Sequence, residues 1–387
     1  MIQIIDKSQC CGCTACASIC VHQAITMQPD KSGFKYPVVD ENRCTRCGLC
    51  LKVCSFSPNY YNFDNLPVPD VYAARHKKMD EIERSRSGAM FITISDWILS
   101  QGGVCYGAGY MDHFRVVHKR ATTSSERDEF RGSKYVQSDL NDVFIQIAND
   151  LKSGLYVLFT GTPCQTAGLS SFLRLKRIKA DSLYLVDIVC HGVPGPYYWR
   201  DYLAYIEKKT GNKITTVNFR DKTKLGWAAH KESFCFGNKV TYFDTYTYLF
   251  YQHLMFRQSC KKCYFTNLQR PSDMTIADFW GWEKVDPSFN ADDKGVSLVL
   301  VNTEKGRTLF DAVKNQVHYI KTDTSHCLQP NLQHPTVPHP LRDSFEKDYS
   351  RFGFEYVAKK YANLGWRYKF RRMKHKFGTL LRRIVRK

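Results

Sequence analysis

Sixteen of the 387 residues are cysteines, and their spacing is the strongest chemical signal in the sequence. Nine of them lie before residue 55, and the stretch "CCGCTACASIC" alone holds five in eleven residues. The spacing C-x2-C-x2-C-x3-C occurs twice, first at Cys10, Cys13, Cys16 and Cys20, then at Cys44, Cys47, Cys50 and Cys54. Disulfides are rare in reducing compartments, where dense cysteines point to metal binding or catalysis. Two copies of one irregular spacing therefore predict two related metal centres.

This spacing is that of bacterial two-cluster ferredoxins, in which the fourth cysteine of each run ligates the cluster of the other run. The sequence predicts one [4Fe–4S] cluster on Cys10, Cys13, Cys16 and Cys54, and a second on Cys44, Cys47, Cys50 and Cys20. Cys11 fits neither triplet. Val21 and Ser55 stand where a proline usually follows the fourth cysteine, and that proline shapes the chain without binding iron. A pair of structural zinc sites is the competing interpretation, because four thiolates also suit zinc.

Four further cysteines lie in segments that are expected to be strand ends or loops, namely Cys164, Cys190, Cys260 and Cys263. Together they predict a third [4Fe–4S] cluster, and a zinc site is the alternative for the same four thiolates. Cys164 also has a separate interpretation as a nucleophile, because a helix N-terminus lowers the pKa of a thiol.

After a Pro- and Asn-rich linker over Ser57–Asp70, short apolar runs alternate with helical segments. "GVCYGAGY", "LYVLF", "LYLVDIV", "MTIADFW" and "VSLVLVN" read as strands, and "SGAMFITISDWILSQ" reads as a helix capped by Ser87. This alternation predicts an α/β region with a mostly parallel sheet, which follows an α+β ferredoxin-like N-terminal domain.

The remaining motifs resemble one family in their order: "RSRSGAMFITISDWILSQGG", "GSKYVQS", "FTGTPCQTAGL", "CHGVPGPYYWRDYL", "FRDK", "CKKCYF" and "ADFWG". Over roughly residues 1–320 the chain resembles the coenzyme F420 hydrogenase/dehydrogenase beta-subunit family. The resemblance implies a two-cluster ferredoxin-type domain at 1–58, followed by the N-terminal domain type of that family at 71–150 and its C-terminal domain type at 151–330. It also implies a flavin, with FAD expected over FMN or F420, and it agrees with the third cluster. Ala89 stands where the family usually has a second glycine.

The residues themselves give candidates for a cofactor pocket. Gly161 and Thr162 lie between a strand end and a helix start, where free backbone N–H groups bind phosphate, and Ser87-Gly88 opens another helix. Lys134 and Tyr135 are candidates to contact a phosphate and to stack on a ring. His191 and Asp278 are the candidate catalytic residues, and Trp280 is a candidate pocket wall. Each of these has a purely structural alternative, as a turn, surface or core residue.

The formal charge of +19 belongs mainly to the end of the chain, because the last 29 residues hold 12 Lys and Arg and no acid. A basic amphipathic tail over 355–387 predicts contact with an anionic membrane surface. Nucleic-acid binding and a solvated tail are the alternatives, and a nucleic-acid partner is not expected. The N-terminus shows no secretory signal and no apolar run spans a bilayer, so we expect a cytoplasmic protein, peripheral at the inner membrane through this tail.

The expected function is that of an iron–sulfur flavoprotein oxidoreductase, which takes electrons from a ferredoxin or another electron-transfer protein and delivers them to a small-molecule substrate. Family members encoded near polysaccharide genes suggest a link to polysaccharide biosynthesis. The alternative is a non-catalytic electron-transfer subunit of a larger complex. A third option, an iron–sulfur nucleic-acid-binding protein, rests on the tail alone.

Overall fold

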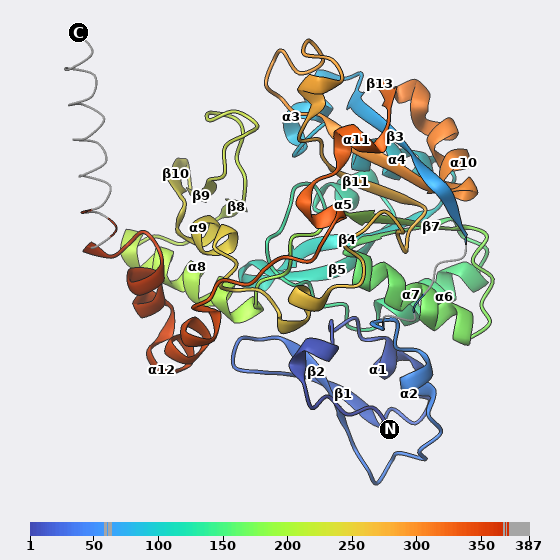
Figure 1. Cartoon of the computed structure of the whole chain (residues 1–387), viewed down its shortest axis with the longest axis horizontal. Coiled ribbons are helices and arrows are strands. Elements are labelled where there is room, and N and C mark those ends of the chain that lie inside the picture. The colour runs from blue at the N-terminus through green and yellow to red at the C-terminus, as the bar shows by residue number, and fades with distance from the viewer. Residues whose placement is uncertain (58–59, 61–63, 367, 369, 371–387) are drawn as a thin grey trace.

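The computed structural model describes residues 1–57, 60, 64–366, 368 and 370. Residues 1–57 form a small module of the expected α+β kind, drawn in blue in Figure 1. Its elements are α1 (Ala15–Ile19), β1 (Ile25–Pro29), β2 (Lys35–Val39) and α2 (Leu49–Lys52). The two strands pair antiparallel, and both short helices begin within the cysteine runs.

An eight-stranded sheet forms the centre of the rest of the chain (Figure 1). Its order is β13 (Val317–Thr322), β3 (Asn65–His76), β12 (Ser297–Thr303), β11 (Met274–Asp278), β7 (Leu183–Ile188), β6 (Val157–Gly161), β4 (Val104–Met111) and β5 (Arg115–Ala121). The four strands from β11 to β4 are parallel, and the outer strands are antiparallel. The predicted α/β class is therefore confirmed, but the sheet is mixed. Strands from 71–150 and from 151–330 lie side by side in it.

Helices cover both faces of this sheet, as the apolar sequences of β6 and β7 require. One face packs against α4 (Met90–Ser100) and α10 (Glu304–Val313). The other face packs against α6 (Val143–Lys152) and α7 (Pro163–Leu175). The N-terminal module lies on this second layer, because α1 shares an apolar core with α6 and α7 (Figure 1).

The remaining elements lie around this core. They are the helices α3 (Met79–Arg84), α5 (Ser124–Asp128), α8 (Pro196–Thr210), α9 (Thr245–Tyr251), α11 (Thr324–Cys327) and α12 (Arg342–Tyr361), and the strands β8 (Thr216–Asn218), β9 (Glu232–Phe236) and β10 (Lys239–Phe243). The last three form a separate antiparallel sheet, and it packs with α8, α9 and α12 around a cluster of aromatic side chains.

Two local expectations are wrong. Ser87 does not cap α4, because its Oγ donates to the carbonyl of Val296 at 2.5 Å and the N-cap position is Ala89. The linker predicted over Ser57–Asp70 is shorter, because β3 begins at Asn65 and pairs there with β12.

Part of the predicted basic tail belongs to α12, which continues to Tyr361 and packs on α8 through Phe354, Val357 and Ala358. Residues 367, 369 and 371–387 lie outside the described part of the chain. None of the described helices is both long enough and apolar enough to cross a membrane.

Ala89 and Gly88 show why the start of α4 favours glycine. Ala89 is buried and has φ +66°, in the left-handed region that costs a side chain about 1–2 kcal/mol. A Cβ on Gly88 would lie 2.1 Å from the carbonyl oxygen of Ala74 and 2.8 Å from the amide of Ser297. Gly88 is therefore required for two backbone segments to approach each other.

We expect Ala89→Gly to raise the free energy of unfolding by about 0.5–1 kcal/mol, because glycine relieves this strain but loses part of the gain to chain entropy. The midpoint of thermal unfolding of the anaerobically purified protein should rise. Ala148→Gly, in the middle of α6, is the matched control, and it should lower the free energy of unfolding by about 1 kcal/mol. Equal losses in both variants would contradict the strain at Ala89.

Candidate functional site

A cavity of about 470 Å³ opens at the carboxyl ends of β6, β7 and β11. This is the edge at which open α/β sheets commonly bind ligands. Residues singled out from the sequence line it from five separate segments: Ser87, Lys134, Tyr135, Gly161, Thr162, His191, Asp278 and Trp280. Gly88 does not line it, and its role is the close backbone packing described above.

The candidate cofactor side chains are already engaged in building the walls. Lys134 Nζ donates to the backbone carbonyls of Arg131 at 2.9 Å and Glu129 at 3.0 Å, and burial lowers the pKa of this lysine to about 7. The ring of Tyr135 stacks on Phe250 with centroids 4.3 Å apart. The amide of Thr162 donates to Gln165 Oε1 at 2.9 Å at the start of α7. A ligand in the cavity would therefore contact the sides of these side chains and the backbone groups that are not already hydrogen-bonded.

The walls carry more positive than negative side chains. Four Lys or Arg side chains line the cavity, namely Arg86, Arg131, Lys134 and Arg220, and its single carboxylate is Asp278. Asp278 Oδ2 lies 2.5 Å from Arg220 Nη1 and 3.7 Å from Arg86 Nε. Asp278 is thus the counter-charge of two arginines. This pairing makes Asp278 a weaker candidate for proton transfer than the sequence suggested. Arg131 is paired with Glu81 at 2.6 Å, and burial brings the pKa of Lys134 to about 7. The excess positive charge therefore comes from Arg86 and Arg220, and it suits an anionic ligand.

Three histidines line the same cavity, namely His118, His191 and His230, and burial lowers the pKa of each. Burial lowers the pKa of His191, and nearby His253 and Arg220 lower it further. Burial, Arg220 and Arg86 bring the pKa of His230 to about 4, and its Nδ1 lies 2.6 Å from the hydroxyl of Tyr251. Sequence reasoning missed His230 and Tyr251, and it assigned no role to Arg86 or Arg220, although both arginines lie inside motifs that it singled out.

Four of the cysteines outside the N-terminal module, namely Cys164, Cys190, Cys260 and Cys263, converge beside this cavity. Burial raises the pKa of Cys190 well above its ordinary value, and the neighbouring sulfurs of Cys260, Cys164 and Cys263 raise it further. Cys164 lies in the first turn of α7, and Thr162 Oγ1 lies 3.3 Å from its sulfur. Cys190 also lines the cavity. The set of four cysteines and the cavity are therefore adjacent, with Cys190 belonging to both.

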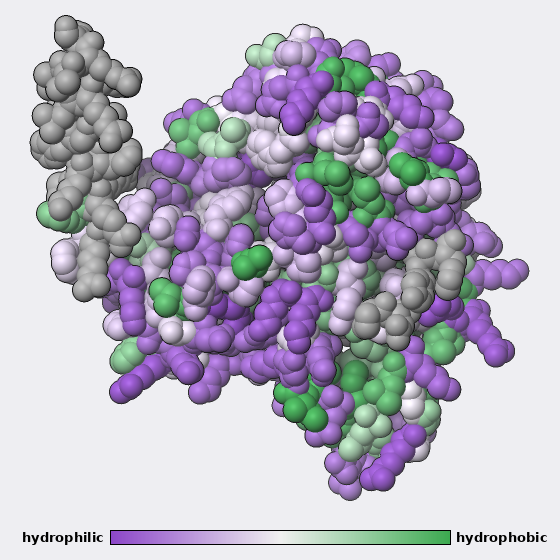
Figure 2. Space-filling view, in the orientation of Figure 1, coloured by the Kyte–Doolittle hydropathy of each residue, from purple (hydrophilic) through white to green (hydrophobic). Residues whose placement is uncertain are grey.

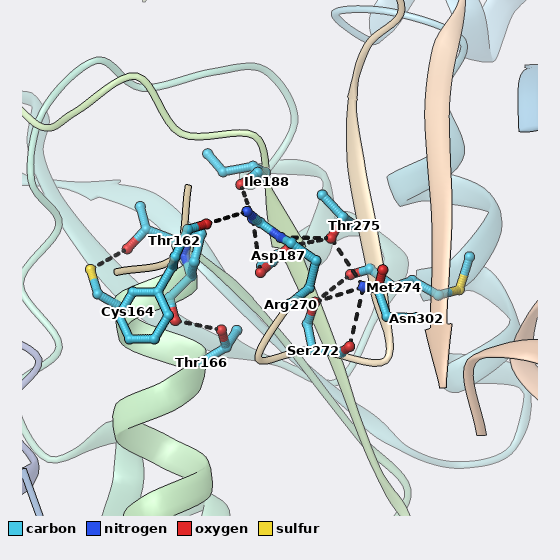
Figure 3. Close-up of polar contacts among 12 residues, drawn as sticks. Thr162, Cys164, Thr166, Asp187, Ile188, Arg270, Ser272, Met274, Thr275 and Asn302 are labelled. Atoms are coloured by element: carbon cyan, nitrogen blue, oxygen red, sulfur yellow. Dashed lines mark hydrogen bonds and ion pairs between the residues drawn. The ribbon is translucent and has the colours of Figure 1, made fainter. Parts of the chain in front are cut away.

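A buried ion pair holds the segments that carry these thiols (Figure 3). Arg270 and Asp187 are fully buried, and Arg270 Nη2 lies 3.0 Å from Asp187 Oδ2. Arg270 also donates to the carbonyls of Ile188 at 2.9 Å and Phe265 at 2.5 Å. Ile188 lies two residues before Cys190 and Phe265 two residues after Cys263. The guanidinium therefore joins the two loops that supply three of the thiols.

In the N-terminal module, Cys54 lies with the first run of cysteines. Burial raises the pKa of Cys16, and the sulfurs of Cys13, Cys10 and Cys54 raise it further. In the second run Cys47 is exposed and Cys50 is buried, where its sulfur accepts from the amide of Ile2 at 3.3 Å. Cys20 accepts from the amide of Ala24 at 3.3 Å.

Cys11 lies between the first run and the thiols beside the cavity. Hydrogen bonding with Cys13 and Cys164, together with burial, raises the pKa of Cys11 well above its ordinary value. The same hydrogen bonds lower the pKa of Cys13 and bring that of Cys164 to about 7. Cys11 is therefore a protonated thiol that contacts a sulfur of each group.

The surroundings of the sulfurs distinguish candidate ligands from ordinary buried thiols. Backbone N–H groups two residues further on donate to Cys10, Cys13, Cys54, Cys190 and Cys263. Cys105 and Cys327 instead donate to the carbonyls of Ser95 and Thr324. Peptide N–H groups pointing at thiolates fit an iron–sulfur cluster. Among the described residues, no three His, Cys, Asp or Glu side chains form a site for a single metal ion.

Comparison with known families agrees with this division of the chain. Residues 9–57 match the family model of the 4Fe-4S dicluster domain, and residues 155–325 match the model for the C terminus of the coenzyme F420 hydrogenase/dehydrogenase beta subunit. The chain is thus similar to 4Fe-4S dicluster domains over residues 9–57 and to the beta-subunit family over residues 155–325. The first match supports iron–sulfur clusters in the N-terminal module, and the second supports an oxidoreductase family of this kind for residues 155–325.

Among solved structures, a chain of the xenon-derivatised F420-reducing [NiFe] hydrogenase complex from Methanosarcina barkeri is similar at 15% sequence identity with a TM-score of 0.47. The match covers 78% of this chain and 93% of that chain. No curated protein matches the sequence.

We expect Arg270→Met to lower the free energy of unfolding by about 3–5 kcal/mol, because it leaves the Asp187 carboxylate buried without its counter-charge. Chemical denaturation of the anaerobic protein measures this loss. The double variant with Asp187→Asn removes the unpaired charge and should recover part of the stability. A single variant as stable as the parent protein would contradict the role of this ion pair.

Proposed function

We propose that this chain is an iron–sulfur flavoprotein oxidoreductase that carries electrons between its N-terminal clusters and a small molecule held in the cavity. One observation carries the proposal: Cys190 belongs to the group of four converging thiols and also lines the cavity. A group bound by these thiols would therefore lie against any ligand in the cavity.

The proposed ligand sets are those expected from the cysteine spacing. The first set is Cys10, Cys13, Cys16 and Cys54, the second is Cys44, Cys47, Cys50 and Cys20, and the third is Cys164, Cys190, Cys260 and Cys263. Contact of Cys11 with both Cys13 and Cys164 supports a short path between the first and third sets. Iron–sulfur clusters would supply one-electron steps, and a flavin would combine them into a two-electron step.

The cavity supports a bound flavin and an anionic substrate. Its volume falls within the roughly 300–1,000 Å³ that is usual for ligand pockets. The excess of basic side chains suits the phosphate groups of FAD, which we propose as the flavin. Buried neutral His191 is the proposed hydrogen-bonding group toward the ligand. A small-molecule cavity that opens beside the third set favours an enzyme over a non-catalytic electron-transfer subunit. The link to polysaccharide assembly stays a prediction from the resemblance.

Cofactor content of the anaerobically purified protein tests this proposal. We expect about twelve irons per chain, from three four-iron clusters, together with bound flavin. Cys164→Ser should lose about four irons, because it removes one ligand of the third set. Cys327→Ser is the matched control, because Cys327 is a buried thiol that donates to a backbone carbonyl. A parent protein with only the iron of two clusters, or a Cys164→Ser variant with unchanged iron, would contradict the third cluster.

The partner that delivers electrons is proposed to be an acidic ferredoxin or a similar protein. Cys47 is exposed, and the exposed side chains of Arg43, Arg46 and Lys52 lie near it in the sequence. Exposed apolar residues of the module include Val21 and Leu51, and Figure 2 shows apolar side chains gathered over the module at the bottom of the view. A basic rim around apolar contacts suits an acidic partner.

We expect the triple reversal Arg43→Glu, Arg46→Glu and Lys52→Glu to slow reduction by an acidic ferredoxin at least about tenfold at low ionic strength. The difference should narrow as salt screens the charges. Stopped-flow absorbance measures the rate. Arg307→Glu, Lys314→Glu and Lys321→Glu together form the control, because they lie around α10 and β13 at the far end of the molecule (Figure 1). Equal slowing in both variants would contradict docking at the module.

A further inference from the structure

The guanidinium of Arg257 is buried between the N-terminal module and the rest of the chain. It is 1% exposed, and its charged end lies 4.2 Å from the ring centre of Tyr36 and 5.4 Å from that of Phe34. Its Nε donates to the carbonyl of Cys10 at 2.7 Å, and its Nη1 donates to Gln137 Oε1 at 2.9 Å. Nη2 donates to the carbonyl of Lys35 at 2.8 Å and to the sulfur of Cys10 at 3.6 Å.

No carboxylate of the described residues pairs with this guanidinium, which distinguishes it from the other deeply buried arginines. Arg270 pairs with Asp187, Arg127 with Asp96, and Arg342 with Glu346. Arginine does not lose its proton in proteins, and a buried charge is costly unless an opposite charge compensates it. The groups around Arg257 that are able to carry negative charge are Cys10, Tyr36, Cys11 and Cys260. Hydrogen bonding and burial raise the pKa of Cys11, and burial raises the pKa of Tyr36, so both stay protonated. The counter-charge would therefore come from the sulfurs of Cys10 and Cys260 as ligands of the proposed centres.

The position of Arg257 joins the first and third ligand sets. Its amide donates to the carbonyl of Val193, three residues after Cys190, and its carbonyl accepts from the amide of Cys260, each at 3.0 Å. Its backbone therefore belongs to the segment that carries the third set, while its side chain reaches Cys10 of the first. The loop of the first set is shaped to receive it, because a Cβ on Gly12 would lie 2.8 Å from Nη1.

We propose that Arg257 is the internal counter-ion shared by the first and third ligand sets, and that it raises the reduction potential of the centres they hold. The inference rests on the proposed function for the presence of those clusters. Reduction of a cluster adds one negative charge, and a fixed, unscreened positive charge nearby favours that state. The same attraction docks the N-terminal module against the rest of the chain.

Redox titration of the anaerobic holoprotein, followed by electron paramagnetic resonance, tests the inference with Arg257→Met and Arg257→Lys. Arg257→Met should make reduction at least about tenfold less favourable for a cluster of the first or third set, which is about 59 mV for one electron. Arg257→Lys keeps the charge and should recover most of the shift. The change should not depend on ionic strength, because the site is buried.

Two controls separate charge from general damage. Arg127→Met removes an equally buried arginine that lies in the contact of α5 with α4, and it should leave every potential unchanged. The cluster of the second set should also stay unchanged in Arg257→Met, because among the described residues Arg257 hydrogen-bonds to none of its cysteines.

The outcomes distinguish this inference from the proposed function. An Arg257→Met protein with full iron and parental potentials would overturn the inference and leave the proposed function intact. A parent protein without clusters would overturn the proposed function. If Arg257→Met does not assemble its clusters, Arg257→Lys decides. A lysine variant with full iron and parental potentials supports the inference that the charge sets the potentials. A lysine variant that assembles but has potentials lowered by as much as loss of the charge would cause contradicts it.

Discussion

The structure depends on bringing many sulfur atoms together in the buried interface between the N-terminal module and the rest of the chain. One close point is Gly168 in the middle of α7, where a Cβ would lie 2.8 Å from the sulfur of Cys13. A side chain at this position would push the N-terminal module off the helix. Cys13, Cys11 and Cys164 meet beside this contact. The start and middle of one helix therefore fix how near the module comes to the cavity.

Burying so many ionisable sulfurs creates a charge problem that the chain solves with arginines of two kinds. Arg270 has its own carboxylate in Asp187, so the pair is nearly neutral and its effect is mechanical: it fixes the loops beside Cys190 and Cys263. Arg257 has no carboxylate among the described residues, so its charge remains available to nearby thiolates. Peptide N–H groups that point at the sulfurs add partial positive charge without a further side chain.

Sequence reasoning could find what is encoded locally. The two cysteine runs show their role by spacing alone, and the cavity residues at Gly161–Thr162 and Cys190–His191 follow from the rule that ligands gather at carboxyl strand ends. Strand identity was equally accessible, because β6 and β7 are apolar on both faces. Domain matches at residues 9–57 and 155–325 agree with that division.

What the sequence could not show depends on contacts between residues that are far apart in the chain. Nothing near Arg257 in the chain indicates that its side chain reaches Cys10, 247 residues away. Ser87 was misread as a cap because the left-handed backbone at Ala89 shifts the start of α4 by two residues.

The electrostatics of the cavity and those of the thiol interface have one consequence in common. On the cavity side, Arg86 and Arg220 outnumber Asp278, and burial together with the positive charge that remains lowers the pKa of His230. On the interface side, Arg257 faces the sulfurs. Negative charge arriving at the third set would therefore have arginine on both sides, one toward the module and two toward the cavity. With the proposed cluster on the third set, such an arrangement would stabilise added electrons at the wall formed by Cys190. An anionic ligand in the cavity would offset part of that effect, which would link ligand binding to the potential of the third set thermodynamically.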